Sequence, residues 1–87
     1  MMNINIVSEL TRFELELLYR VEGIDEVELN RLIVSNLILG YNVGDCLVFE
    51  VSSGSSYGIK VEVTKYEEFE YEFTIKEMVH IDDEERY

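Results

Sequence analysis

The strongest constraint on the fold is an alternation of apolar and polar residues in the stretch EEFEYEFTIKE, residues 67–77. Successive side chains on a strand point to opposite faces, so the pattern predicts a strand with one face in a core and the other in water. The inward positions would be Phe69, Tyr71, Phe73 and Ile75, and the outward ones Glu68, Glu70, Glu72, Thr74 and Lys76. The unusual point is that three consecutive outward positions are glutamate, because like charges on one sheet face repel.

Two further stretches predict strands that pair with this one. CLVFEV at 46–51 is rich in β-branched and aromatic residues, and YGIKVEVTK at 57–65 alternates as the opening stretch does. The connections are a flexible Gly/Ser loop, SSGSS at 52–56, and a turn, KYEE at 65–68. Short connections join neighbouring antiparallel strands, so we expect a three-stranded meander.

Two helices are predicted upstream of these strands. Ser8 is the expected N-cap of the first, which carries apolar residues at helical spacing and ends at Gly23. The second runs from about Glu26 to Leu39 after Asp25, and its second half is apolar around nearly the whole circumference. We expect this helix either to be central to the core or to contact a partner chain.

The predicted fold class is therefore α+β, with two helices packed on one face of a three- or four-stranded antiparallel sheet. The order is strand, helix, helix, strand, strand, strand if residues 3–7, NINIV, form a first strand, which five residues alone do not decide. A chain of 87 residues suits one domain, which we place at 1–81 with an acidic tail at 82–87.

Charge excludes some functions. Nineteen acidic residues against seven basic ones give a net charge of −12. Direct binding to nucleic acid or to an anionic membrane needs clustered Lys and Arg, so neither is expected. The N-terminus lacks the pattern of a signal peptide, and no apolar run reaches the length of a membrane span. We expect a cytoplasmic protein.

Few residues are suited to catalysis. Cys46 is the only cysteine, starts a predicted strand and is expected to be a buried, inert thiol. His80 is the only histidine, and a metal site with Asp82 is a weak alternative to an ordinary surface residue. No glycine pattern matches a phosphate-binding loop. We therefore expect no catalytic residue, no metal, no cofactor and no enzymatic activity.

The acidic residues are the remaining candidate site. Residues two apart on a strand lie about 6.8 Å apart, and neighbouring strands about 4.8 Å apart, so the outward acids would form rows of carboxylates. Such rows suit a surface that binds DNA through Lys and Arg. The candidate partner-binding residues are Glu50, Glu62, Glu68, Glu70, Glu72, Asp82, Asp83, Glu84 and Glu85.

A small, acidic, cysteine-poor α+β domain with outward glutamates resembles the DNA-mimic inhibitors that bacteriophages make during host takeover. The resemblance lies in charge, size and layout across the chain, since this class has no shared motif. It implies that the protein occupies the nucleic-acid-binding surface of a basic host protein, for example nucleoid protein HU, in the host cytoplasm. Inhibition would then be by occupancy, without turnover.

A second hypothesis belongs to another class. The apolar second helix could be the contact surface of a protein–protein adaptor, antitoxin or immunity protein, or of a homodimer. Ile33 and Ile38 would then lie in the contact. An enzyme with a carboxylate-only or metal site is a third, weaker hypothesis.

Overall fold

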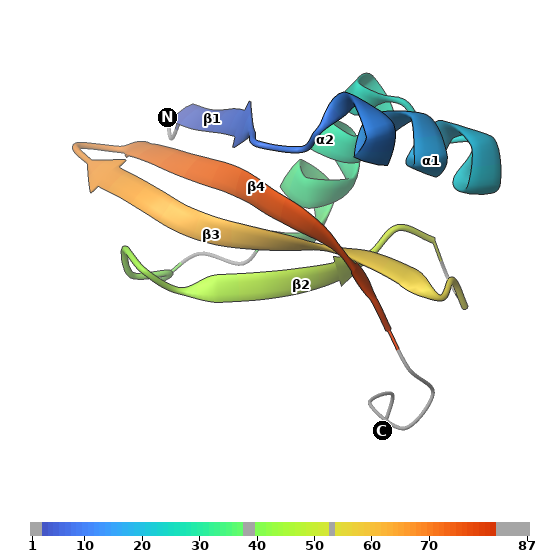
Figure 1. The fold of residues 1–87 in the computed structure, drawn as a ribbon. Coiled ribbons are helices and arrows are strands. Elements are labelled where there is room, and N and C mark those ends of the chain that lie inside the picture. Colours follow the sequence, from blue (N-terminus) through green and yellow to red (C-terminus); the bar gives the residue numbers. More distant parts are fainter. Residues whose placement is uncertain (1–2, 38–39, 53, 82–87) are drawn as a thin grey trace.

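The fold is α+β, as predicted, with two helices and a four-stranded sheet (Figure 1). The structure is a computed structural model that describes residues 3–37, 40–52 and 54–81. Its elements are β1 (Asn3–Ser8), α1 (Arg12–Glu22), α2 (Glu26–Asn36), β2 (Cys46–Glu50), β3 (Tyr57–Glu67) and β4 (Glu70–His80). The strand order in the sheet is β1-β4-β3-β2.

The sheet is mixed, which corrects the prediction of a fully antiparallel one. β2, β3 and β4 form the expected antiparallel meander, but β1 is parallel to β4. Residues 3–7 do form a strand, and it lies beside the last strand of the chain. Alternation within a strand identifies its two faces but not its neighbour, so the sequence pattern could not give this pairing.

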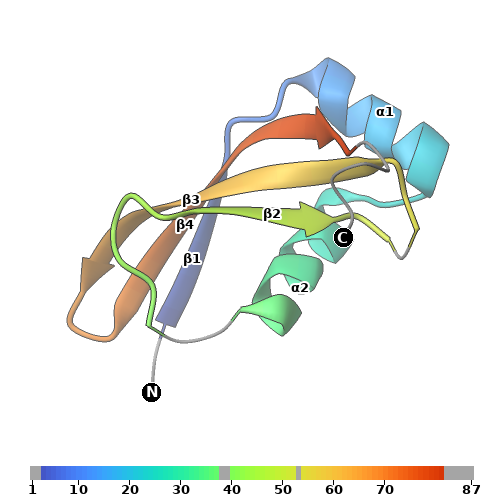
Figure 2. The same ribbon diagram turned by 90° about the horizontal axis from the view of Figure 1, so that it is seen from below.

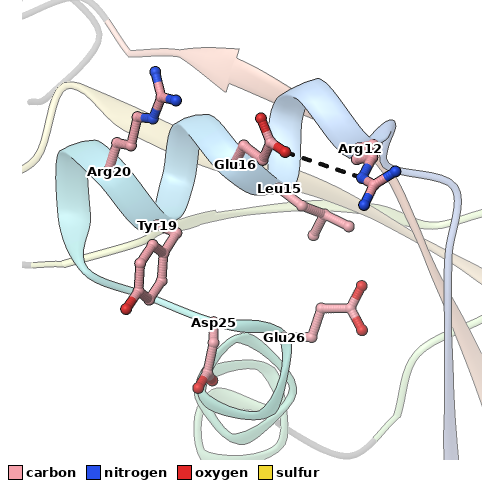
Figure 3. Close-up of a pocket in the computed structure, with 7 residues that line it drawn as sticks. All are labelled: Arg12, Leu15, Glu16, Tyr19, Arg20, Asp25 and Glu26. Atoms are coloured by element: carbon pink, nitrogen blue, oxygen red, sulfur yellow. Dashed lines mark ion pairs between the residues drawn. The ribbon is translucent and has the colours of Figure 1, made fainter.

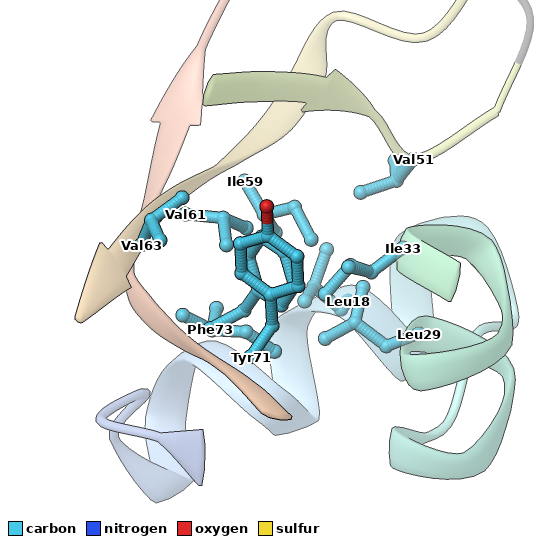
Figure 4. Close-up of a cluster of buried hydrophobic side chains, with 10 residues drawn as sticks. Leu18, Leu29, Ile33, Val51, Ile59, Val61, Val63, Tyr71 and Phe73 are labelled. Atoms are coloured by element: carbon cyan, nitrogen blue, oxygen red, sulfur yellow. The ribbon is translucent and has the colours of Figure 1, made fainter. Parts of the chain in front are cut away.

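The core lies on one face of this sheet. Figure 2 shows that β1 runs at a steep angle to β2, so the sheet is strongly twisted, with α2 on one side of it. Both helices contribute buried side chains to the same cluster (Figure 4). The cluster consists of Leu18, Leu29, Ile33, Val51, Ile59, Val61, Val63, Tyr71, Phe73 and Ile75. The predicted inward parity of β3 and β4 is thus confirmed from Ile59 to Val63 and from Tyr71 to Ile75.

The start of α1 differs from the prediction. Thr11, not Ser8, is the N-cap, because the Thr11 side chain accepts a hydrogen bond from the Glu14 N–H and Glu14 reaches back to the cap. Ser8 is the last residue of β1. The core-facing side of the helix is centred on Leu18, which leaves Phe13 at 73% and Val21 at 52% exposed.

The second helix is shorter and less apolar on its outer side than predicted. It ends at Asn36, and Leu37 already has extended backbone angles. Ile33 is fully buried in the core, so it cannot form a contact surface. Ile38, the other residue expected in such a contact, lies outside the described residues. The apolar side chains that α2 exposes are Val27 and Val34.

Glu14 joins α1 to the edge of β4 beyond the end of β1. One carboxylate oxygen accepts the Thr11 N–H at 3.0 Å, and the other accepts the Met78 N–H at 3.0 Å. These two backbone hydrogen bonds lower the pKa of Glu14, because they favour its charged form. A single side chain therefore caps the helix and satisfies a strand-edge donor.

Hydrogen bonds connect the described residues of the SSGSS loop to α1. Ser55 is only 7% exposed, and its hydroxyl donates to Glu22 of α1 at 2.6 Å. The Ser52 hydroxyl donates to the other oxygen of Glu22 at 3.1 Å. The end of α1 is thus tied to the β2–β3 connection.

We expect Glu14→Gln to destabilise the fold by about 1–2 kcal/mol in urea unfolding at pH 7, because charge-assisted hydrogen bonds weaken when the acceptor is neutral. Glu16→Gln is the matched control. Glu16 lies on the same helix and has only an exposed ion pair with Arg12 at 3.9 Å, so its loss should cost less than about 0.5 kcal/mol. Equal losses in the two variants would contradict this role of Glu14.

The same carboxylate predicts a pH dependence. Its pKa is lower in the folded state than in the unfolded chain, so its contribution is present above the unfolded pKa of about 4.3 and is lost as pH falls through the folded value. Between about pH 5 and pH 3, wild type should therefore lose more stability than Glu14→Gln. Parallel curves of unfolding free energy against pH for the two proteins would contradict this contribution of Glu14.

Candidate partner-binding surface

A two-residue turn at 68–69 joins β3 to β4, whereas the sequence predicted the turn at 65–68. β3 continues to Glu67, which lies opposite Glu70, so the turn residues are Glu68 and Phe69. Both have positive φ angles, +33° and +70°. A tight hairpin of this type needs left-handed backbone at both positions, which side chains other than Asn, Asp and Gly disfavour. Glu68 and Phe69 are therefore not strand residues, and Phe69 does not face the core.

Acidic side chains gather around this turn. We call Glu67, Glu68, Phe69 and Glu70 the acidic hairpin end. All four are exposed, with Phe69 at 70%. The three carboxylates line a shallow hollow of about 330 Å³. Among the residues that the structure describes, a partly exposed cation is nearby, since Lys65 Nζ lies 3.7 Å from a Glu67 oxygen. In Figure 1 this end of the hairpin projects away from both helices.

The rest of the outer sheet face carries both signs of charge. A register shift between Val63 and Lys65 makes Lys65 the residue opposite Glu72. Residues directly opposite on adjacent strands share a face, so a cation lies beside the third glutamate of the predicted row. A second shift, between Lys60 and Val61, places Lys60 opposite Glu77. The bulges thus break up the acidic row that strict alternation predicts.

Glu62 lies in the middle of this face and also has a cation close to it. Lys76 forms an ion pair with Glu9 at 3.0 Å. Its pKa is raised, first by the hydrogen bond and charge of Glu9 and then by the charge of Glu62. Beside them, the Thr64 and Thr74 hydroxyls are 2.9 Å apart. The centre of the outer face is thus polar, but Thr74 is only 4% exposed, which corrects its prediction as a residue in water.

Glu50 lies far from the acidic hairpin end. It is the last residue of β2 and is opposite Gly58, near the start of β3. Nine residue steps separate Gly58 from Glu67, which corresponds to about 30 Å along a strand. The four tail acids, Asp82, Asp83, Glu84 and Glu85, lie outside the described residues. The structure therefore brings together Glu68 and Glu70, with Glu72 next to them, and separates Glu50 and Glu62 from them.

Two residues at the acidic hairpin end were missed from the sequence. The sequence pattern predicts Glu67 in the turn and Phe69 in the core, whereas both are exposed at the end of the hairpin. The turn carries no Asn-Gly or Asp-Gly, which is the usual sequence mark of such a hairpin. The position of the turn could have been located only by following the apolar alternation of β3 and of β4 to the point where the two strands meet.

Cys46 and His80, which were considered for catalysis and metal binding, have ordinary surroundings. Cys46 is exposed, so the prediction of a buried thiol is wrong. It lies on the outer parity of an edge strand, opposite Glu62. His80 packs edge-on against Tyr57, with ring centroids 5.6 Å apart. Within residues 3–37, 40–52 and 54–81, no three His, Cys, Asp or Glu side chains are placed to hold a metal ion.

Another concave feature is a hollow between α1 and the start of α2 (Figure 3). Its volume is about 290 Å³, and its lining residues are Arg12, Leu15, Glu16, Tyr19, Arg20, Asp25 and Glu26. Arg12 is already paired with Glu16. The lining mixes two cations with three acids around apolar atoms, so its chemistry selects no class of ligand.

Comparisons with protein-family models, with curated proteins and with solved structures found no match to this chain. Across the part of the chain that the structure describes, neither helix has the length and apolar content needed to cross a bilayer.

We expect the double substitution Glu68→Asn and Phe69→Gly to stabilise the fold by about 1–2 kcal/mol, because Asn-Gly accepts left-handed backbone at both turn positions. Thermal and urea unfolding would measure the gain. Glu68→Gln with Phe69→Leu is the control, since these residues keep the disfavoured backbone and should leave stability within about 0.5 kcal/mol of wild type. A double variant no more stable than this control would show that the turn is not strained.

Proposed function

We propose that this protein is a binding protein without turnover, whose acidic surface occupies the nucleic-acid-binding surface of a basic host protein such as nucleoid protein HU. The observation that carries the proposal is the acidic hairpin end. It combines three exposed carboxylates with one neighbouring cation, on a chain whose net charge is −12.

Geometry favours the acidic hairpin end over the rest of the sheet as the point of contact. The outer face holds Glu62 and Glu72 close to Lys76 and Lys65, so its local field is partly neutralised. At the turn the backbone projects from the body of the protein, and a groove or pocket on a partner could receive it. Net negative charge over the whole chain would add long-range attraction to a cationic surface and raise the association rate.

Phe69 gives this contact an apolar component. A phenyl ring that is 70% exposed between acidic neighbours has a large area to bury on binding. Aromatic side chains are enriched among residues that dominate interface energies. The proposed partner surface therefore combines Lys or Arg residues with an apolar recess that fits one aromatic ring.

In this proposal the acidic hairpin end alone mimics DNA, and the mimicry does not extend over the whole outer face of the sheet. Duplex DNA carries about one negative charge per 1.7 Å of its axis. The carboxylates of Glu67, Glu68 and Glu70, with Glu72 beside them, would replace a few phosphates at one position. A partner that holds DNA mainly through phosphate contacts could accept such a substitute.

A second candidate function rests on a different surface. Phe13, Leu17 and Val21 are spaced four residues apart and so lie along one flank of α1, where Phe13 and Val21 are more than half exposed. Such a flank suits an adaptor, antitoxin or immunity protein that binds through apolar contact. Salt separates the two candidates, because screening weakens the acidic contact but leaves apolar burial intact or stronger.

The test uses immobilised protein to capture basic proteins from a bacterial lysate at low salt, followed by affinity measurement with purified HU and with each captured DNA-binding protein. Glu67→Gln, Glu68→Gln and Glu70→Gln combined should weaken binding at least about tenfold. Binding by wild type should fall steeply between about 0.05 and 0.5 M NaCl, and the protein should compete with DNA.

The matched control combines Glu16→Gln, Glu26→Gln and Glu28→Gln on the helices. It brings the net charge to −9, as the hairpin variant does, but changes exposed acids away from β3 and β4. Equal weakening by both sets would mean that only overall charge matters. Undiminished binding by the hairpin variant would contradict the proposed site, and loss through Phe13→Ser with Val21→Ser would favour the α1 flank.

A further inference from the structure

The outer edge of β1 is an open sheet edge. β1 is the first strand in the order β1-β4-β3-β2, and no element lies on its far side in Figure 1. The N–H groups of Asn3 and Glu9 donate to Phe69 and Ile75 of the neighbouring strand segment, at 2.7 and 2.8 Å. Bonding groups alternate along a strand, so Ile4, Ile6 and Ser8 direct their N–H and C=O groups away from β4.

β1 also lacks the features that usually block pairing at an edge. Its sequence, NINIVS, contains no charged residue, no proline and no glycine, whereas β2, β3 and β4 each carry charged side chains. It pairs with β4 without a register shift. Edge strands are commonly protected by Lys, Pro or bulges, and uncharged regular edges template pairing with another strand. Ile4 and Val7, on opposite faces, are 37% and 39% exposed.

We propose that β1 pairs antiparallel with β1 of a second copy of this chain, which makes one eight-stranded sheet across a twofold axis at Ile6. In this register Ile6 faces Ile6 of the second copy and Ile4 faces its Ser8. Each of these pairs exchanges two backbone hydrogen bonds, so every outward group of the three residues is satisfied. A register centred on another residue would leave some of these groups unpaired.

Charge selects a second copy over a strand from a basic protein. A basic segment gains no ion pair from β1, because the strand has none of the acids that the chain carries elsewhere. A second β1 places Asn5 opposite Val7 and Val7 opposite Asn5, with no like charges facing each other. The nearest charged neighbour in the chain, Glu9, is already paired with Lys76 at 3.0 Å. Two chains of net charge −12 could thus approach here with no acid on either facing strand, the closest cross-strand acids being Glu70 and Glu72 of β4, opposite Asn3 and Asn5.

The twofold arrangement leaves the acidic hairpin end free. The β3–β4 turn lies beside the start of β1, where the Asn3 N–H donates to the Phe69 C=O at 2.7 Å. β1 lies between the turn and the second copy, so each copy would present its own turn. A dimer would therefore offer two acidic contacts to a partner that has two basic arms or two sites, which raises avidity without any new contact. The dimer itself does not depend on the proposed function.

The first experiment measures mass by analytical ultracentrifugation from about 10 μM to about 1 mM chain, a range that spans weak interfaces of this small size. We expect a monomer–dimer equilibrium that shifts toward dimer as NaCl rises from about 0.05 to 0.5 M, because salt screens repulsion between the copies. Binding of a basic partner should show the reverse salt trend, so failure of one proposal is distinguishable from failure of the other. A monomer throughout this range would overturn the inference.

Two charge-matched variants locate the interface. Asn5→Glu with Val7→Glu places like charges opposite each other across the proposed axis and should abolish the dimer. Val27→Glu with Val34→Glu adds the same charge to the exposed side of α2 and should leave it intact. The opposite result would assign the dimer to α2 and overturn the β1 interface. Ile4→Pro gives a second blocking variant that keeps the bonds to β4, since the Ile4 N–H points outward.

The register is tested by cross-linking in a Cys46→Ser background, which removes the native exposed thiol. Ile6→Cys should form a disulfide-linked dimer on mild oxidation, because facing residues in a hydrogen-bonded antiparallel pair have Cα atoms about 5.5 Å apart. Ile4→Cys should not, because it faces Ser8 of the second copy. Cross-linking of Ile4→Cys in preference to Ile6→Cys would overturn this register.

Discussion

The long β3–β4 hairpin is the constraint on which the rest of the structure depends. Its inner parity supplies Ile59, Val61 and Val63 from one strand, and Tyr71, Phe73 and Ile75 from the other. These six of the ten buried core residues fix which face the helices must cover. Successive side chains of a strand point to opposite faces of the sheet. The pairing of β3 with β4 that places the core residues therefore also places the charged residues of the outer face.

Two bulges and a turn decide how that outer charge is distributed. An unbroken alternation would line one face with glutamate, at a cost in repulsion that a core of ten residues could poorly offset. The register shifts instead bring Lys65 opposite Glu72 and Lys60 opposite Glu77. Glu68 and Glu70 meet Glu67, which pairs with Lys65, at the turn, where the backbone itself is disfavoured. Disfavoured backbone persists where surrounding structure holds it, and such sites are often functional.

The sequence predicted those features that a local period determines. The alternation within β3 and β4 predicted most of the buried core residues. Gly23 ends α1 and Asp25 caps α2, as expected. Features that depend on long-range partners were not predictable in this way. Whether Ser8 or Thr11 caps α1 depends on β1 pairing with β4 through Ser8, and the position of the turn depends on Glu67 meeting Glu70. The alternation of residues 67–77 is real from Tyr71 onward but says nothing about bulges, which moved Lys65 and Lys60 to face acids.

The central claim is that the acidic hairpin end contacts a basic partner, and the most direct measurement is an NMR titration of isotope-labelled protein with purified HU. The account predicts that the largest amide shifts occur from Glu67 to Glu70, that they saturate, and that they disappear at high salt. Shifts confined to the flank of α1 around Phe13 and Val21, or the absence of saturable shifts for HU and for every captured DNA-binding protein, would contradict it.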